Sequence, residues 1–187
     1  MRKIISVFFS SLLVTNAAYA AKTSFSVSSD EVKKGGTIKE AQVFNGFGCT
    51  GGNVSPSLHW KGVPAGTQSF AVTMYDPDAP TGNGWWHWVV FNIPANVMGL
   101  EKGAGNPNAT TLSAGAIQSR TDFGKPGYGG PCPPVGDKPH NYIFTVYALK
   151  TDKLPLDENS GSATVGFYIH RNTLAKAVLK AKFGRKK

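Results

Sequence analysis

Two aspartates, two histidines and a tyrosine of this 187-residue chain stand beside strongly apolar segments. Asp76 and Asp78 alternate with prolines in the sequence DPDAP, and His87 follows among three tryptophans. His140 lies two residues before Tyr142. Burying an ionisable group is costly unless the group is paired or hydrogen-bonded. The combination therefore predicts a functional site, and its residue types suit acid–base catalysis, metal binding or the binding of a charged ligand.

Each of these residues also has an ordinary structural interpretation. A single histidine beside tryptophans is often a satisfied core residue, and DPDAP can form a turn whose aspartates accept backbone N–H groups. The sequence GGPCPP, residues 129–134, can likewise be a rigid bend. The order of carboxylates, histidine, Gly-Pro turn and His-x-Tyr along one chain is much harder to explain in this way.

Alternation along the strand-like segments allows the site to be assembled, because residues two apart on a strand share a face. Asp76, His87, His140 and Tyr142 would then each lie at the end of an inward apolar face. The apolar residues of like parity are Phe70, Val72 and Met74 for Asp76; Trp85, Val89, Phe91 and Ile93 for His87; and Phe144, Val146 and Ala148 for His140 and Tyr142. Converging strand ends of this kind predict a concave apolar pocket with a few polar groups.

Short apolar or alternating runs separated by turn residues predict a mainly β fold, an antiparallel sandwich or barrel. These runs cover residues 25–29, 37–44, 58–64, 69–75, 86–94 and 141–149. The glycine-rich segment 99–130 is expected to be an extended loop. Segment 172–184 is expected to form a C-terminal amphipathic helix with Leu174, Ala177, Val178 and Ala181 on its apolar face, and segment 162–170 fits a strand or a first helix.

Residues 1–20 have the pattern of a secretory signal peptide, which leaves residues 21–187 as one domain. Arg2 and Lys3 precede an apolar run from Ile4 to Val14, and small residues flank Tyr19 before the expected cleavage after Ala20. The run is too short to span a bilayer, and no later segment is a transmembrane candidate. We expect a periplasmic or secreted protein.

The formal net charge of +9 would fall to +7 once Arg2 and Lys3 are removed. A basic protein suits anionic partners, but no nucleic-acid-binding motif accompanies the lysine-rich tail, so nucleic acid is not expected as a partner. An exported chain with two cysteines predicts a disulfide between Cys49 and Cys132. The alternative is that Cys132 is a free thiol beside a ligand.

Taken together, the motifs resemble those of the phosphatidylethanolamine-binding proteins, most closely their exported bacterial members. The resemblance runs from about Phe25 to Gly184 and is carried by residues 76–80, 86–88, 130–134 and 140–142, with the further segment SPSLHW at residues 55–60. It implies two packed antiparallel sheets with terminal helices, forming a β-sandwich. It also implies a small anion pocket for phosphate or phosphorylethanolamine-like groups, such as a phospholipid head group.

Carried over residue by residue, the resemblance gives the pocket Asp76, Asp78, His87, Gly130, Pro131, His140 and Tyr142, with Trp86 in its wall. It implies a binding protein rather than an enzyme, with no metal or other cofactor. Bacterial relatives are often described as kinase-inhibitor-like because eukaryotic members bind protein kinases. A protein partner is therefore a further expectation.

The residue types suit an anion because phosphate oxygens need N–H and O–H donors. His87, His140 and Tyr142 can supply them from side chains, and a glycine before Pro131 lets a backbone amide approach closely. We expect Asp76 or Asp78 to orient one of the two histidines and to raise its pKa.

Three other functions use the same residues. A hydrolase could use the aspartates and histidines as acid and base, with Cys132 as the available nucleophile unless it is oxidised. Asp76, His87 and His140 could form a metal site, although their spacing is not that of a known metal motif. An interaction protein could capture a partner's terminus or phosphorylated residue in the same pocket.

Overall fold

The computed structural model describes residues 24–108, 112–113 and 115–187, so the expected signal peptide lies outside the described residues. A five-stranded antiparallel sheet has the order β10-β9-β5-β6-β8, and a three-stranded antiparallel sheet has the order β1-β4-β7. The large sheet consists of β5 (Ser69–Asp76), β6 (Trp85–Pro94), β8 (Ile117–Gln118), β9 (His140–Leu149) and β10 (Thr173–Phe183). The small sheet consists of β1 (Ser26–Ser28), β4 (Leu58–Lys61) and β7 (Gly99–Leu100). The expected mainly β, two-sheet fold is confirmed.

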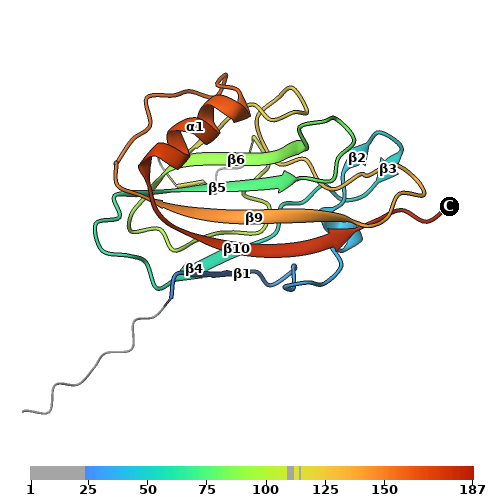
Figure 1. Ribbon diagram of the computed structural model, residues 1–187, viewed down its shortest axis with the longest axis horizontal. Coiled ribbons are helices and arrows are strands. Elements are labelled where there is room, and N and C mark those ends of the chain that lie inside the picture. Colours follow the sequence, from blue (N-terminus) through green and yellow to red (C-terminus); the bar gives the residue numbers. More distant parts are fainter. Residues whose placement is uncertain (1–23, 109–111, 114) are drawn as a thin grey trace, which may run out of the picture.

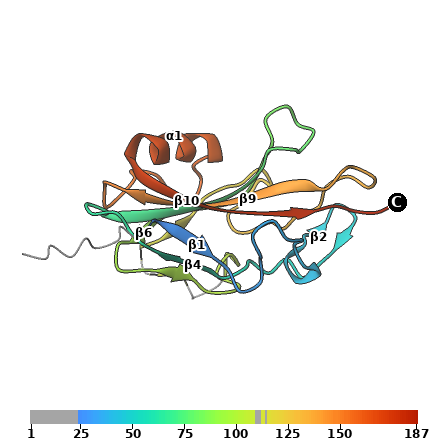
Figure 2. The same cartoon turned by 60° about the horizontal axis from the view of Figure 1, so that its bottom comes forward.

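The main core lies between these two sheets, on the side of the large sheet that faces β1 and β4 (Figure 2). Every second residue of β5 and β9 enters it, as their alternating sequences require. Phe70, Val72 and Met74 come from β5, and Tyr142, Phe144 and Val146 come from β9. Asp76 and His140 continue these two faces to the end of the sheet, where the main core opens to the cavity described below.

A single α-helix, α1 (Ser162–Asn172), covers the opposite face of the large sheet (Figures 1 and 2). Its buried residues, Ser162, Val165, Gly166 and Ile169, follow the spacing of one helical face. Val165 and Ile169 belong to a second apolar cluster with residues of β5, β6 and β9. Segment 162–170, which fitted a strand or a helix, is therefore helical.

The expected amphipathic helix at residues 172–184 is wrong, because this segment forms β10. The same sequence also alternates with a period of two, and Ala177, Leu179 and Ala181 are buried while Val178 and Lys180 between them are exposed. β10 pairs with β9 along ten residues, from Thr173 opposite Leu149 to Phe183 opposite His140. This pairing satisfies the backbone of β9, which would otherwise be an exposed edge strand.

Among the described residues of segments 37–44 and 99–130, most of the chain is irregular. Segment 37–44, one of the strand-like runs, forms the short 3-10 helix η1 (Glu40–Gln42) and a single bridge from Thr37 to Lys182. Segment 99–130 is mainly loop, as expected, with β7 and β8 as its only strands in the described part. Of the helices in the described ranges, none combines the length and apolarity that a membrane crossing needs.

Two irregularities in the pairing of β5 with β6 decide which way the β6 side chains point. Met74 pairs with Trp88 but Tyr75 pairs with Trp86, so His87 is an extra residue between them. A second irregularity includes Asn92, whose φ is +57°. Extra residues of this kind change the face on which the following side chains lie.

Candidate functional site

A cavity of about 160 Å³ opens where β5 ends and where β6 and β9 begin. Asp76, His87, His140 and Tyr142 supply its polar groups. The remaining lining residues are mostly apolar: Phe47, Ala79, Pro80, Thr81, Trp85, Phe123, Cys132, Pro133 and Pro134. The structure therefore brings four of the predicted site residues together at one end of the sheet.

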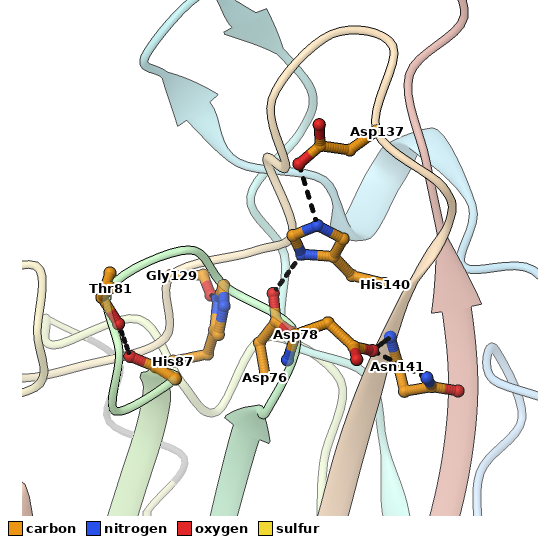
Figure 3. Close-up of polar contacts among 9 residues, drawn as sticks. Asp76, Asp78, Thr81, His87, Gly129, Asp137, His140 and Asn141 are labelled. Atoms are coloured by element: carbon orange, nitrogen blue, oxygen red, sulfur yellow. Dashed lines mark hydrogen bonds and ion pairs between the residues drawn. The ribbon is translucent and has the colours of Figure 1, made fainter.

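Asp76 holds the ring of His140 in place (Figure 3). Nδ1 of His140 donates to Oδ2 of Asp76 at 2.8 Å, and both side chains are buried. The other carboxylate oxygen, Oδ1, accepts the backbone N–H of Asp78 at 2.8 Å. On the far side of the ring, Nε2 of His140 lies 3.4 Å from Oδ2 of Asp137. The expected pairing of an aspartate with a histidine is thus present between Asp76 and His140.

Asp78 supports the site from outside the cavity. Its Oδ2 accepts both the backbone N–H and the side-chain Nδ2–H of Asn141, each at 2.7 Å (Figure 3). These hydrogen bonds from Asn141 hold the pKa of the Asp78 carboxyl below its usual range. Asp78 therefore fixes the loop after β5 to the start of β9, while Asp76 faces the cavity.

His87 is held by the backbone and not by a carboxylate. Its Nδ1 donates to the carbonyl oxygen of Gly129 at 2.7 Å (Figure 3). Burial lowers the pKa of His87 to about 4, because removing the ring from water disfavours its charged form. A raised pKa was expected for the histidine that an aspartate orients, and His87 is not that histidine. The charge of the nearby Asp76 raises the pKa of His87, but by less than burial lowers it.

The parity expected for His87 holds for Trp85 and Ile93 but is wrong for Val89 and Phe91. Val89 and Phe91 belong to the cluster beneath α1, whereas His87 lines the cavity on the other side of the sheet. The extra residue in β6 separates His87 from the alternation that follows it. The ring of His87 meets that of Tyr142 edge-on, with centroids 5.2 Å apart.

Tyr142 places a buried hydroxyl group in this cluster. The hydroxyl oxygen has no hydrogen-bond partner among the described residues. Burial raises the pKa of the Tyr142 phenol, and the charge of the Asp76 carboxylate and a contact between it and the hydroxyl raise it further, so the group keeps its proton. An unpaired buried hydroxyl is costly, and a ligand in the cavity is a natural partner for it.

Gly130 and Pro131 lie behind the cavity wall and do not line it. The Gly130 amide donates to Oδ1 of Asn53 at 2.8 Å, so it is already used. The Pro131 carbonyl accepts from the amide of Phe44 at 3.1 Å. A Cβ at position 130 would collide with the carbonyl oxygen of Gln42, so this glycine serves close packing of two loops.

Trp86 likewise lies away from the cavity, and its neighbour Trp85 lines the wall instead. The Trp86 ring packs on Tyr75, with centroids 4.9 Å apart, on the α1 side of the sheet. Phe123, which the sequence did not indicate as a site residue, contacts the rings of both Trp85 and His87. The ring centroids are 5.5 Å apart for Trp85 and 5.4 Å apart for His87. It belongs to the irregular segment 99–130, where no periodicity could assign its side chain to a face.

A disulfide joins Cys49 and Cys132, as expected, and forms part of the cavity wall. It ties strand β3 (Cys49–Thr50) to the proline-rich segment 131–134. β3 pairs with β2 (Asn45–Gly46), and Phe47 in the turn between them is 71% exposed at the cavity mouth. Arg185 lies beside this bond, with Nη1 3.3 Å from each sulfur atom.

The candidate metal and nucleophile chemistry finds limited support in this geometry. Within the described ranges, no group of three or more His, Cys, Asp or Glu side chains is arranged to hold a metal ion. The sulfur atoms of Cys49 and Cys132 are bonded to each other, so neither is a thiol nucleophile.

Comparison with known proteins shows the family of the chain. Residues 28–184 match the family described as phosphatidylethanolamine-binding protein. The chain belongs to that family. Two similar proteins of Escherichia coli (strain K12) are UPF0098 protein YbcL and UPF0098 protein YbhB. YbcL is 57% identical over 164 residues, which is 88% of each chain, and YbhB is 50% identical over 155 residues, 83% of this chain and 97% of YbhB.

Solved structures of phosphatidylethanolamine-binding proteins show the same fold. The crystal structure of E. coli YbcL, described as a new member of the mammalian family, superposes with a TM-score of 0.85 at 55% identity, covering 88% of this chain and 99% of YbcL. The putative homologue CT736 from Chlamydia trachomatis D/UW-3/CX gives a TM-score of 0.71 at 26% identity, covering 86% of this chain and 97% of that chain. The family resemblance of the sequence motifs is confirmed.

Proposed function

We propose that this phosphatidylethanolamine-binding protein family member binds a small anionic group, such as phosphate or the head group phosphorylethanolamine, in the cavity between His87 and His140. The observation that carries the proposal is the buried hydroxyl of Tyr142, which lines the cavity without a partner. A phosphate oxygen would accept the hydrogen bond that the described protein groups leave unmade.

The size and walls of the cavity favour a head group over a whole lipid. A volume of about 160 Å³ corresponds to roughly five water molecules at about 30 Å³ each. The aromatic side chains of Trp85, Phe123 and Phe47 also line the cavity. They suit the ethyl and ammonium parts of phosphorylethanolamine, since aromatic faces attract cations.

We further propose that the protein is exported and that it binds rather than hydrolyses its ligand. The signal-like pattern of residues 1–20 and the disulfide between the two cysteines both support an oxidising compartment such as the periplasm. The joined sulfur atoms count against Cys132 as the nucleophile of a hydrolase. Exposed Phe47 at the mouth would allow a protein partner to contact the occupied cavity.

The test is titration calorimetry with phosphorylethanolamine on the wild-type protein and on Tyr142→Phe. Losing one hydrogen bond to a charged ligand oxygen should weaken binding by about tenfold or more, at about 1.5–3 kcal/mol per bond. The stability of Tyr142→Phe should change little, because the hydroxyl approaches the Asp76 carboxylate without the geometry of a hydrogen bond.

Tyr147→Phe is the matched control, because Tyr147 lies on the same strand but on the face covered by α1. This variant should bind phosphorylethanolamine like the wild type. Wild-type protein that gives no binding heat, or equal affinities for Tyr142→Phe and the wild type, would contradict the proposed site.

A further inference from the structure

The imidazole of His87 faces the cavity with a hydrogen-bond acceptor. Its Nδ1 lies 2.7 Å from the carbonyl oxygen of Gly129, and because a carbonyl oxygen only accepts, Nδ1 carries a proton. In the neutral ring Nε2 then holds a lone pair. His87 lines the cavity, and the other backbone contact of its ring is with Gly130, whose amide donates to Asn53 and not to the ring. The lone pair of Nε2 is therefore free for a ligand that donates.

The surroundings of His87 keep the ring neutral. The titratable groups around it are Asp76 on β5, His140 and Tyr142 on β9, and Asp137 in the loop before β9. Asp76 is engaged with His140, and Tyr142 keeps its proton. Burial sets the pKa of His87 at about 4, so Nε2 stays an acceptor at the pH values at which phosphate esters ionise.

The cavity is poor in fixed positive charge. No lysine or arginine is among the described residues that line it, and Arg185 lies against the two sulfur atoms of the disulfide. The Asp76 carboxylate is part of the lining. The imidazole of His140 also lines the cavity, but it lies between the carboxylates of Asp76 and Asp137, which offset any positive charge that it carries. A doubly charged phosphate would therefore meet the lone pair of His87 in a lining without net positive charge. A singly charged phosphate that carries one acidic hydroxyl avoids this conflict.

We propose that the cavity selects a phosphate monoester in its singly protonated form, whose P–OH donates to Nε2 of His87 while another phosphate oxygen accepts from the Tyr142 hydroxyl. The inference rests on the proposed function and adds the protonation state that the site takes. It makes His87 a specificity-determining residue that separates phosphate esters from sulfate esters, because a sulfate monoester has no acidic proton to donate.

The experiment compares phosphorylethanolamine with ethanolamine O-sulfate by titration calorimetry. Near pH 5 both compounds carry one negative charge on the ester and one ammonium group, and they differ in the acidic hydroxyl. The phosphate ester should bind at least about tenfold more tightly, the effect of one hydrogen bond. From pH 5 to pH 8 the phosphate loses its proton, with a second pKa of about 6. The ratio of the two affinities should therefore fall with rising pH, and the ratio cancels titration of the protein itself.

His87→Asn tests the assigned residue, because its shorter amide can still donate to the Gly129 carbonyl but has no group in place of Nε2. The ratio of affinities near pH 5 should drop toward one in this variant. His170→Asn is the matched control: Nδ1 of His170 also donates to a backbone carbonyl, that of Gly166, at 2.7 Å, but on α1. It should keep the wild-type ratio.

The outcomes separate this inference from the proposed function. Equal binding of the two esters by the wild-type protein, with a ratio that does not change with pH, would overturn the selection of the protonated phosphate and leave the anion pocket standing. Binding of neither ester would overturn the proposed function itself. The wild-type comparison decides both points even where His87→Asn does not fold.

Discussion

Asp76→Ala is expected to lower the free energy of unfolding by about 3 to 5 kcal/mol, the effect of removing one partner of a buried pair. Asp76 accepts from Nδ1 of His140 and from the amide of Asp78, each at 2.8 Å. Without the carboxylate, the buried ring of His140 loses the group that pairs with and orients it. Urea unfolding followed by tryptophan fluorescence measures the loss, with the slope of the transition checked for a two-state change.

The control for this prediction is Asp30→Ala. Asp30 also pairs with a histidine, His59, but the two side chains are 79% and 45% exposed and lie 3.5 Å apart. An exposed pair of this kind contributes less than about 1 kcal/mol. Equal, small losses in the two variants would show that the Asp76–His140 pair does not hold this end of the sheet together.

Removing the disulfide is the second change with a large expected effect. The double variant Cys49→Ser/Cys132→Ser should lose about 2 to 5 kcal/mol of unfolding free energy, because the bond closes a long loop and restricts the unfolded chain. The two cysteines are 83 residues apart in sequence. Affinity for phosphorylethanolamine should fall as well, since Cys132 and Phe47 belong to the cavity wall that the bond fixes.

Chemical denaturation of the double variant, beside wild-type protein with and without reductant, measures this effect. Reduced wild-type protein should match the double variant, since both lack the same constraint. A double variant with the unfolding midpoint and the affinity of the oxidised wild type would contradict the structural role assigned to the bond.

The sequence predicted the parts of the site that lie on regular strands. β5 and β9 keep an unbroken alternation, so the sequence alone places Asp76, His140 and Tyr142 on the faces of their apolar neighbours. His87 lines the cavity for a different reason: it is the extra residue in β6, and it breaks the alternation of that strand. An irregular pairing depends on the partner strand, and a single sequence does not show it.

Two further errors have the same origin in tertiary context. Residues 173–183 fit both a helical and a strand period, and pairing with β9 decided between them. The sequence left open which of the two histidines an aspartate would orient; in the structure Asp76 pairs with His140, and burial lowers the pKa of His87. Gly130 was expected to bring an exposed backbone amide close to a ligand, but its amide donates to Asn53 and its close contact is with a protein loop.

The most direct test of the anion pocket is a crystal of this protein soaked with phosphorylethanolamine at pH 5. The account predicts phosphate density in the cavity, with one oxygen within hydrogen-bonding distance of the Tyr142 hydroxyl and another of Nε2 of His87. Density found only on surface lysines, or a cavity that holds water alone under conditions where calorimetry shows binding, would contradict it.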